Sequence, residues 1–171
     1  GTPPAPMVSV KAPMLDEAGF DARGNRMFAA RYGMDRWVLD GHRTKDGQAL
    51  IPGTGYLEIA AEAMRAQGEA GAFELRDLYF FRPLAVADDD ACDIRAKLIR
   101  SEEGYAFELR SAAVVKGRKG WQVHAQARVL PVAAAARRMD VAAIAARLPA
   151  PETGDGLASP QEAHLKFGPR W

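Results

Sequence analysis

The chain of 171 residues is long enough for one domain that buries roughly 70% of the surface of its unfolded form. Its 48% hydrophobic and 26% charged residues are ordinary for a globular protein, and a net charge of +1 gives no strong field for nucleic acid or a membrane surface. No run approaches the roughly 18 apolar residues of a membrane span, and no signal-peptide pattern opens the chain, so we expect a cytoplasmic protein. The single cysteine, Cys92, excludes an internal disulfide and fits a reducing compartment.

The composition divides the chain into three zones. The proline-rich start, GTPPAPMVSV, is expected to be extended, and globular patterns then continue to Val132. An alanine-rich stretch and the turn-rich PAPETGDGLASP follow, which together are typical of a linker. We therefore predict a globular unit over residues 1–132, a linker with short helices over 133–163, and a final segment over 164–171.

One helix is predicted from about Thr54 to Gln67. The preceding PGTG is a helix start signal, with Thr54 or Gly55 as the expected N-cap, and Gly68 can end the helix. The three-and-four spacing defines an apolar, alanine-rich face around which a sheet could wrap closely, formed by Tyr56, Ile59, Ala60, Ala63 and Met64. The side expected to face solvent holds Glu58, Glu62 and Arg65.

Strand patterns follow the helix. The apolar run over residues 78–81 is typical of a strand covered on both faces. The segments CDIRAKLIRS and YAFELRSAAVV alternate between apolar and polar residues, with EEG as the turn between them. In GWQVHAQARVLPV, the alternation puts Trp121 and Val123 on the same apolar side as Ala125, Ala127 and Val129. One early helix followed by an antiparallel meander predicts an α+β fold in which a curled sheet wraps the helix.

The three histidines differ in their surroundings. His124 lies among polar residues of its strand and is expected to be solvated. His164 follows SPQE, a capping-box pattern with Ser159 as the N-cap, so we expect it on a short helical turn. His42 lies in a polar turn between two apolar segments, a setting that fits a surface turn as well as a functional site.

The stretch DGHRTKDGQALIPGTGYLE resembles the first active-site motif of polyketide synthase dehydratase domains, HxxxGxxxxP. The likeness continues through ELRDLYFFRPLAV, GYAFELRS and GWQVHAQARV, and it ends at HLKFGPRW, which resembles the family's second motif, GYxYGPxF. The family's fold is a double hot dog, in which two units each wrap an antiparallel sheet around a long central helix. The resemblance implies that residues 1–132 form the first hot-dog unit and that residues 164–171 are the opening strand of the second.

The resemblance also implies an activity, the elimination of water from a β-hydroxyacyl thioester to give an α,β-enoyl thioester in a modular polyketide or related fatty-acid synthase. His42 would be the base, because a neutral histidine titrates near ~6.5 and accepts protons at neutral pH. The implied substrate-binding residues are Gly47, Pro52, Gly53, Thr54, Gly55, Phe167, Gly168 and Pro169. The expected partners are the acyl carrier protein with its phosphopantetheine arm, the second hot-dog half and, in a homodimer, a second copy of the chain. No metal or redox cofactor is expected.

The chain departs from the family pattern in three places. Gly47 and Pro52 follow His42 by five and ten residues; each is one more than in the motif, so the turn TKDG has to absorb an extra residue. Leu165 and Phe167 stand where the second motif has tyrosines, which removes a hydroxyl from the site. The family's acidic partner belongs to a DxxxQ-type motif on the second unit, beyond the present sequence.

Glu58 is a possible replacement for that acid. Single-hot-dog dehydratases place an acidic catalytic residue at this point of the central helix, facing the histidine of another subunit. The alternative, favoured by its helix face, is a solvated residue that pairs with Glu62 and Arg65.

Two other functions stay open. One is a product-template-like hot dog that guides cyclisation of a polyketide chain, and the other is a catalytically silent hot-dog module used for packing or docking. The sequence leaves the acyl-chain length, the stereochemistry and the oligomeric state open.

Overall fold

The structure of the chain, a computed structural model, describes residues 6–133, 138–149 and 164–169. None of the helices in these ranges combines the length and the hydropathy that crossing a bilayer requires. The elements in chain order are β1 (Val8–Ser9), β2 (Glu17–Phe20), β3 (Arg26–Tyr32), α1 (Trp37–Asp40), β4 (His42–Thr44), β5 (Ala49–Leu50), α2 (Gly53–Ala66), β6 (Phe73–Phe80), β7 (Ala85–Val86), β8 (Cys92–Arg100), β9 (Tyr105–Val115), β10 (Arg118–Pro131), α3 (Val141–Ala145) and β11 (Leu165–Phe167).

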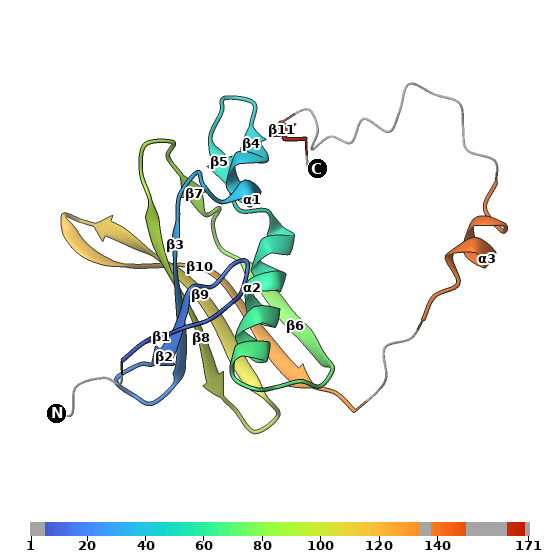
Figure 1. The fold of residues 1–171 in the computed structure, drawn as a ribbon, viewed down its shortest axis with the longest axis horizontal. Helices are drawn as coiled ribbons and strands as arrows, with labels where there is room; N and C mark the ends of the chain where they lie inside the picture. The colour runs from blue at the N-terminus through green and yellow to red at the C-terminus, as the bar shows by residue number, and fades with distance from the viewer. Residues whose placement is uncertain (1–5, 134–137, 150–163, 170–171) are drawn as a thin grey trace.

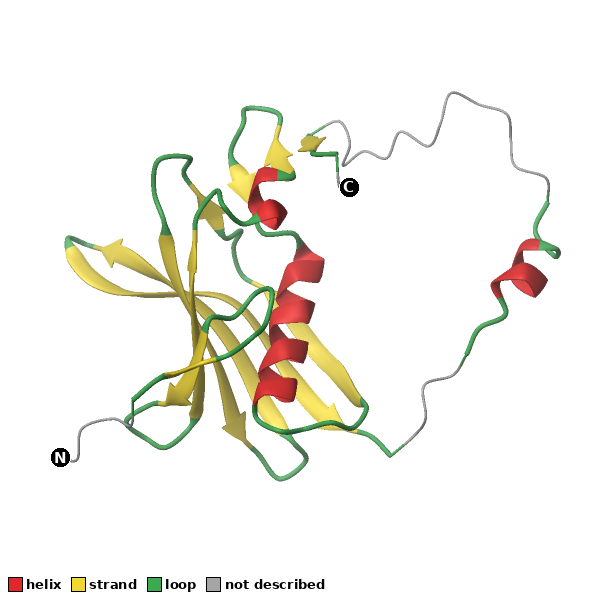
Figure 2. Ribbon diagram, viewed as in Figure 1, coloured by secondary structure: helices red, strands yellow, loops and turns green. Residues whose placement is uncertain are grey.

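A large antiparallel sheet and a small one form the body of the molecule. The large sheet has seven strands in the order β1-β2-β3-β8-β9-β10-β6, and the small sheet has four in the order β11-β4-β5-β7. Figure 1 shows α2 lying along the large sheet, with β4, β5 and β7 beyond the N-terminal end of α2. Figure 2 shows the same arrangement by element type, one long helix against a curled sheet. The predicted α+β arrangement is therefore confirmed, whereas the division of the chain at residues 132 and 163 stays a prediction.

Helix α2 begins one residue earlier than predicted. Its N-cap is Pro52, whose extended backbone (φ −66°, ψ 155°) directs the chain into the helix at Gly53 without a side-chain cap. The prediction of Thr54 or Gly55 as N-cap was therefore wrong. Gly68 follows the helix in the left-handed conformation (φ +95°), as expected for a terminating glycine.

The predicted apolar face of α2 is buried in full. Each of its five residues is at most 4% exposed: Tyr56, Ile59, Ala60, Ala63 and Met64. The helix packs against β8, where Ala96 is also fully buried. Alanines on both sides let the helix and the sheet approach closely, as predicted from the alanine-rich face of the helix.

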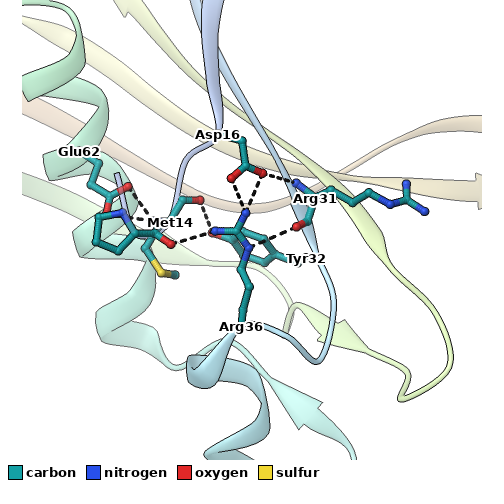
Figure 3. A network of polar contacts seen from close by, with 7 residues as sticks. Met14, Asp16, Arg31, Tyr32, Arg36 and Glu62 are labelled. Atoms are coloured by element: carbon teal, nitrogen blue, oxygen red, sulfur yellow. Dashed lines mark hydrogen bonds and ion pairs between the residues drawn. The ribbon is translucent and has the colours of Figure 1, made fainter. Parts of the chain in front are cut away.

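Glu62 was predicted to face solvent, but it is 2% exposed. Both of its carboxylate oxygens accept a hydrogen bond from the backbone N–H of Met14, at 3.0 and 2.9 Å. The Tyr32 hydroxyl donates to the carbonyl of the same residue at 2.9 Å. The segment before β2 therefore crosses α2 at Glu62 and covers the polar side of the helix (Figure 3).

Arg36 fixes the same segment from the other side. Its guanidinium pairs with the Asp16 carboxylate at 2.5 and 2.6 Å and donates to the carbonyls of Pro13 (2.8 Å) and Arg31 (3.2 Å). It also lies 4.9 Å from the centroid of the Tyr32 ring, a cation–π distance. Figure 3 shows Arg36 between Asp16 and the chain around Met14. This N-terminal segment is thus an integral part of the fold.

Strand β10 contains a bulge at His124, beyond which the inward- and outward-facing side chains exchange places. Its pairing with β9 shifts between Val123 and Ala125, so that the bulge reverses the alternation of side chains. Trp121 and Val123 consequently lie on the face opposite Ala125, and the prediction that placed them together was wrong. On that outer face, the Arg95 guanidinium stacks 4.0 Å from the centroid of the Trp121 ring.

His124 itself is buried, so the prediction of a solvated histidine was wrong. Its Nδ1 lies 3.2 Å from the Arg82 carbonyl oxygen, which can only accept, and its Nε2 lies 2.7 Å from the Ser111 hydroxyl. Burial lowers the pKa of His124, which keeps the ring neutral. The bulge is therefore stabilised by an internal polar pair. The predicted helical turn from Ser159 lies outside the described residues.

Strand β6 lies at an edge of the large sheet. The prediction of a strand covered on both faces at residues 78–81 was wrong, because Tyr79, Phe80 and Phe81 are 60%, 52% and 53% exposed. We call these three residues the aromatic edge. Exposed aromatic side chains at a sheet edge are candidates for an interaction surface.

Glu62→Ala should lower the free energy of unfolding by about 1–3 kcal/mol, because the buried Met14 N–H would lose its acceptor. Glu62→Gln keeps one acceptor oxygen and should lower it less. Chemical denaturation of the two variants and the parent chain measures the difference. Equal losses for the two variants would contradict the role of this hydrogen bond.

The Glu62→Gln variant also tests whether the Glu62 carboxyl group titrates with a raised pKa. Burial raises the pKa of Glu62 above its ordinary 4.5, so the folded chain holds this proton more tightly than the unfolded chain does. The free energy of unfolding of the parent, relative to Glu62→Gln, should therefore rise as the pH falls from above the raised pKa toward 4.5. A difference that does not change with pH would show that Glu62 does not titrate in this range.

Candidate active site

His42 begins β4, and the chain turns back into β5 within a few residues. The Thr44 N–H donates to the Gln48 carbonyl (2.9 Å), and the Gly47 N–H donates to the Thr44 carbonyl (3.0 Å). Gly47 has φ +96°, a conformation that favours glycine. The predicted course, out along one strand and back along the next, is confirmed.

The imidazole of His42 is half-buried and tied to β5. Its Nδ1 lies 3.0 Å from the Leu50 carbonyl oxygen. Because a carbonyl oxygen only accepts, Nδ1 carries the proton, and Nε2 is the basic nitrogen of the neutral ring. The strand pair therefore sets both the orientation and the tautomer of the histidine.

The second predicted motif lies directly against the first. Phe167 in β11 pairs with His42 in β4, and the two ring centroids are 5.8 Å apart. The Gly168 N–H donates to the Gly41 carbonyl at 2.7 Å, and a Cβ on Gly168 would lie only 2.8 Å from the Gly41 Cα. Pro169 follows and is exposed. Figure 1 shows β11 beside β4, although the two strands are far apart in the sequence.

The start of α2 presents backbone donors close to the aromatic edge. Pro52 and Gly55 are buried, and the Gly55 N–H donates to the Pro52 carbonyl at 2.8 Å. Gly53 and Thr54 are exposed, and their N–H groups belong to the first turn, where a helix has no carbonyl of its own to offer. A Cβ on Gly53 would lie 3.6 Å from the Phe80 ring. A substrate carbonyl could be bound at this helix end.

Three carboxylates that could be considered as the acid, Asp40, Asp88 and Glu58, form ion pairs with arginines. Asp40 and Asp88 both pair with Arg43, at 3.1 and 2.6 Å. Glu58 pairs with Arg65 at 2.6 Å, with about half of its side chain exposed. This exposure favours the solvated alternative for Glu58 over a catalytic one.

Two other features of the described chain lie apart from the predicted site residues. Within the described ranges, no three histidine, cysteine or acidic side chains gather as a metal site would require. A hollow of about 680 Å³ lies between β7, β8 and the β9–β10 hairpin, and none of the predicted site residues lines it. Cys92 borders this hollow, and burial raises the pKa of its thiol, which favours the protonated, less nucleophilic form.

Sequence comparison gives a consistent picture. A family model described as "Polyketide synthase dehydratase domain" matches residues 12–112. Polyketide synthase ThaG of Burkholderia thailandensis is 34% identical over 102 residues, which are 57% of this chain and 2% of ThaG. Highly reducing polyketide synthase Preu5 of Preussia isomera is 25% identical over 107 residues, 56% of this chain and 4% of Preu5. The chain therefore corresponds to a small part of these much longer relatives.

Solved structures support the same fold. The dehydratase domain from the CurF module of the curacin polyketide synthase has a TM-score of 0.71 at 22% identity, covering 92% of this chain and 59% of that one. The bifunctional dehydratase-cyclase domain of ambruticin biosynthesis has a TM-score of 0.63 at 26% identity, covering 81% of this chain and 50% of that one. The fold is thus the hot dog, and it fits the first half of a double hot dog, as predicted.

Gly168→Ala should separate β11 from β4, because the new Cβ would meet backbone atoms of Gly41, which cannot rotate away as a flexible side chain can. The NMR signals of the His42 ring should then lose the ring-current shift caused by Phe167. Gly71→Ala is the matched control, since nothing lies within 4 Å of the corresponding Cβ. An unchanged His42 spectrum in Gly168→Ala would contradict the close approach of the two motifs.

Proposed function

Since the chain belongs to the polyketide synthase dehydratase domain family, we propose that it is the N-terminal half of a dehydratase in which His42 is the base. The substrate would be a β-hydroxyacyl thioester on an acyl carrier protein, and the product an α,β-enoyl thioester. One observation carries the proposal, the meeting of the two motifs at His42, with Phe167 paired to it and Gly168 bonded to Gly41.

In the first step, Nε2 of His42 would remove the α proton. Nδ1 cannot do so, because it is protonated and bonded to the Leu50 carbonyl. The electron pair of the broken C–H bond moves toward the thioester, so its carbonyl oxygen gathers negative charge. The N–H groups of Gly53 and Thr54 are suited to binding that oxygen, and such donors stabilise a developing anion strongly.

In the second step, the C=C bond forms while the C–O bond to the β carbon breaks. Hydroxide is a poor leaving group, so an acid must deliver a proton to the departing oxygen, which leaves as water. We assign that acid to the second hot-dog unit of the complete domain, because Asp40, Asp88 and Glu58 are engaged with arginines. The elimination balances without a metal or redox cofactor.

The proposed setting is a modular synthase in the cytoplasm. The acyl carrier protein would deliver the substrate on its phosphopantetheine arm, and the second hot-dog half would complete the domain. Pairing of two complete domains as a homodimer belongs to the same proposal.

Cyclisation is the second candidate function, because the ambruticin domain, which is 26% identical to this chain, is a dehydratase-cyclase. A histidine that removes an α proton can also activate a substrate hydroxyl for addition to the new double bond. Mass spectrometry detects the dehydration, which lowers the mass of the substrate by one water, but not the cyclisation, which leaves the mass of the enoyl product unchanged. Proton NMR distinguishes the two products, because cyclisation removes the vinyl signals of the enoyl thioester.

In the complete domain, His42→Ala should lower the rate of dehydration of a β-hydroxyacyl carrier-protein substrate by at least ~10² to 10⁴, the usual contribution of a positioned base. Thermal unfolding of the variant should change little, because the half-buried ring, which is bonded to Leu50 and contacts Phe167, lies outside the main core. Single-turnover assays measure the loss. In the isolated chain of 171 residues, activity should be negligible even with His42 intact.

Two results would overturn these assignments. Equal rates for the parent domain and His42→Ala would remove the histidine from the mechanism. Full turnover by the isolated chain, abolished by Glu58→Gln, would instead favour two identical subunits that share one site.

We place the second hot-dog unit against the aromatic edge, so the isolated chain should self-associate through it. Replacing both Tyr79 and Phe81 with lysine should restore a monomer, whereas Val114→Lys, at a side chain that is also exposed, should not. Light scattering coupled to size-exclusion chromatography measures the mass in solution. A clean monomer of the unmodified chain would contradict this placement.

A further inference from the structure

Arg43 follows His42 in β4 and links several segments around it. Neighbouring residues of a strand point to opposite faces, so the guanidinium lies on the other side of β4 from the imidazole. It donates to the Gly47 carbonyl at 2.8 Å and pairs with Asp40 (3.1 Å) and Asp88 (2.6 Å). Only 19% of the Arg43 side chain is exposed, although it is charged.

The partners of Arg43 lie both before and after His42 in the sequence. Asp40 is the last residue of α1, immediately before the Gly41–His42 peptide. Gly47 lies in the turn that follows β4, and Asp88 lies after β7, in a segment distant in sequence. One planar guanidinium therefore connects the chain before His42, the chain after it and a separate loop. A lysine, with one compact ammonium, could not hold this set of partners.

We propose that Arg43 is a positioning residue for His42, which holds the β4 turn so that Nε2 points toward the substrate. This deepens the proposed dehydratase function and rests on it. The carboxylates of Asp40 and Asp88 are 69% and 71% exposed, so water and salt weaken both ion pairs. The bond to the Gly47 carbonyl is therefore the contact that fixes the turn.

The expected kinetic effect follows from geometry. A catalytic group displaced by about 1 Å can cost about 10²-fold in rate. Arg43→Met in the complete domain should therefore lower kcat by ~10- to 10²-fold. KM should stay within about twofold, because the guanidinium is on the face of β4 turned away from His42 and contributes no binding energy.

A spectroscopic measurement tests the positioning without any activity. The His42 Nδ1–H that is bonded to the Leu50 carbonyl should give a ring N–H resonance protected from exchange. The difference between spectra of the parent domain and His42→Ala assigns it. In Arg43→Met this resonance should broaden or exchange faster, while the N–H resonance of the buried His124 should not change.

Three further variants make the test specific. Arg31→Met removes another arginine–aspartate pair, that with Asp93 at 2.8 Å, and should leave kcat and the His42 resonance unchanged. Replacing both Asp40 and Asp88 with asparagine keeps the bond to Gly47 and should cost less than Arg43→Met. Arg43→Lys keeps the charge and guards against a variant that fails to fold, and it should fall between the parent and Arg43→Met.

The outcomes are distinct. A lower kcat, an unchanged KM and a disturbed His42 resonance in Arg43→Met support the proposal. An undisturbed resonance in Arg43→Met and Arg43→Lys would overturn it, whatever their kcat. If the parent domain dehydrates no substrate at all, the proposed function fails, but the resonance still decides whether Arg43 positions His42.

Discussion

The close packing of α2 against the curled sheet is the constraint on which the other features depend. Ala60 and Ala63 on the helix and Ala96 on β8 are all buried, and larger side chains at these places would force the two layers apart. Once α2 is held along the sheet, its first turn is fixed as well. Because Pro52 connects β5 to α2, the small sheet and His42 are then placed at the N-terminal end of the helix.

The sequence predicts best what depends on local periodicity. The buried face of α2 and the courses of β8 and β9 follow from the 3.6- and 2-residue repeats of apolar residues. The failures are of another kind. Glu62 is buried because the distant Met14 covers it, and His124 because a bulge shifts β10 by one residue. Strands β1 to β3 and the short helix α1 were not predicted. Strand β3 does carry a period-2 signal, with Phe28, Ala30 and Tyr32 buried, whereas β1 and α1 are too short to show a repeat.

The candidate site divides in the same way. His42 and the Phe167-Gly168-Pro169 segment could be selected because their side chains and spacing resemble known motifs. Their partners could not, because Leu50 and Gly41 contribute carbonyl oxygens. Every residue carries such an oxygen, so the sequence holds no signal for it. The contacts of Arg43 could not be predicted either, because it binds the carbonyl oxygen of Gly47 and pairs with Asp88 in a different part of the chain.

The aromatic edge also matters while the chain is being synthesised on the ribosome. Synthesis adds about 5–20 residues per second, so in the proposed complete domain a second unit of similar size would emerge on the order of ten seconds after the first. Throughout that interval Tyr79, Phe80 and Phe81 face water at the open edge of a sheet, where another nascent chain could pair. An open edge of this kind favours association with other chains for as long as it stays uncovered.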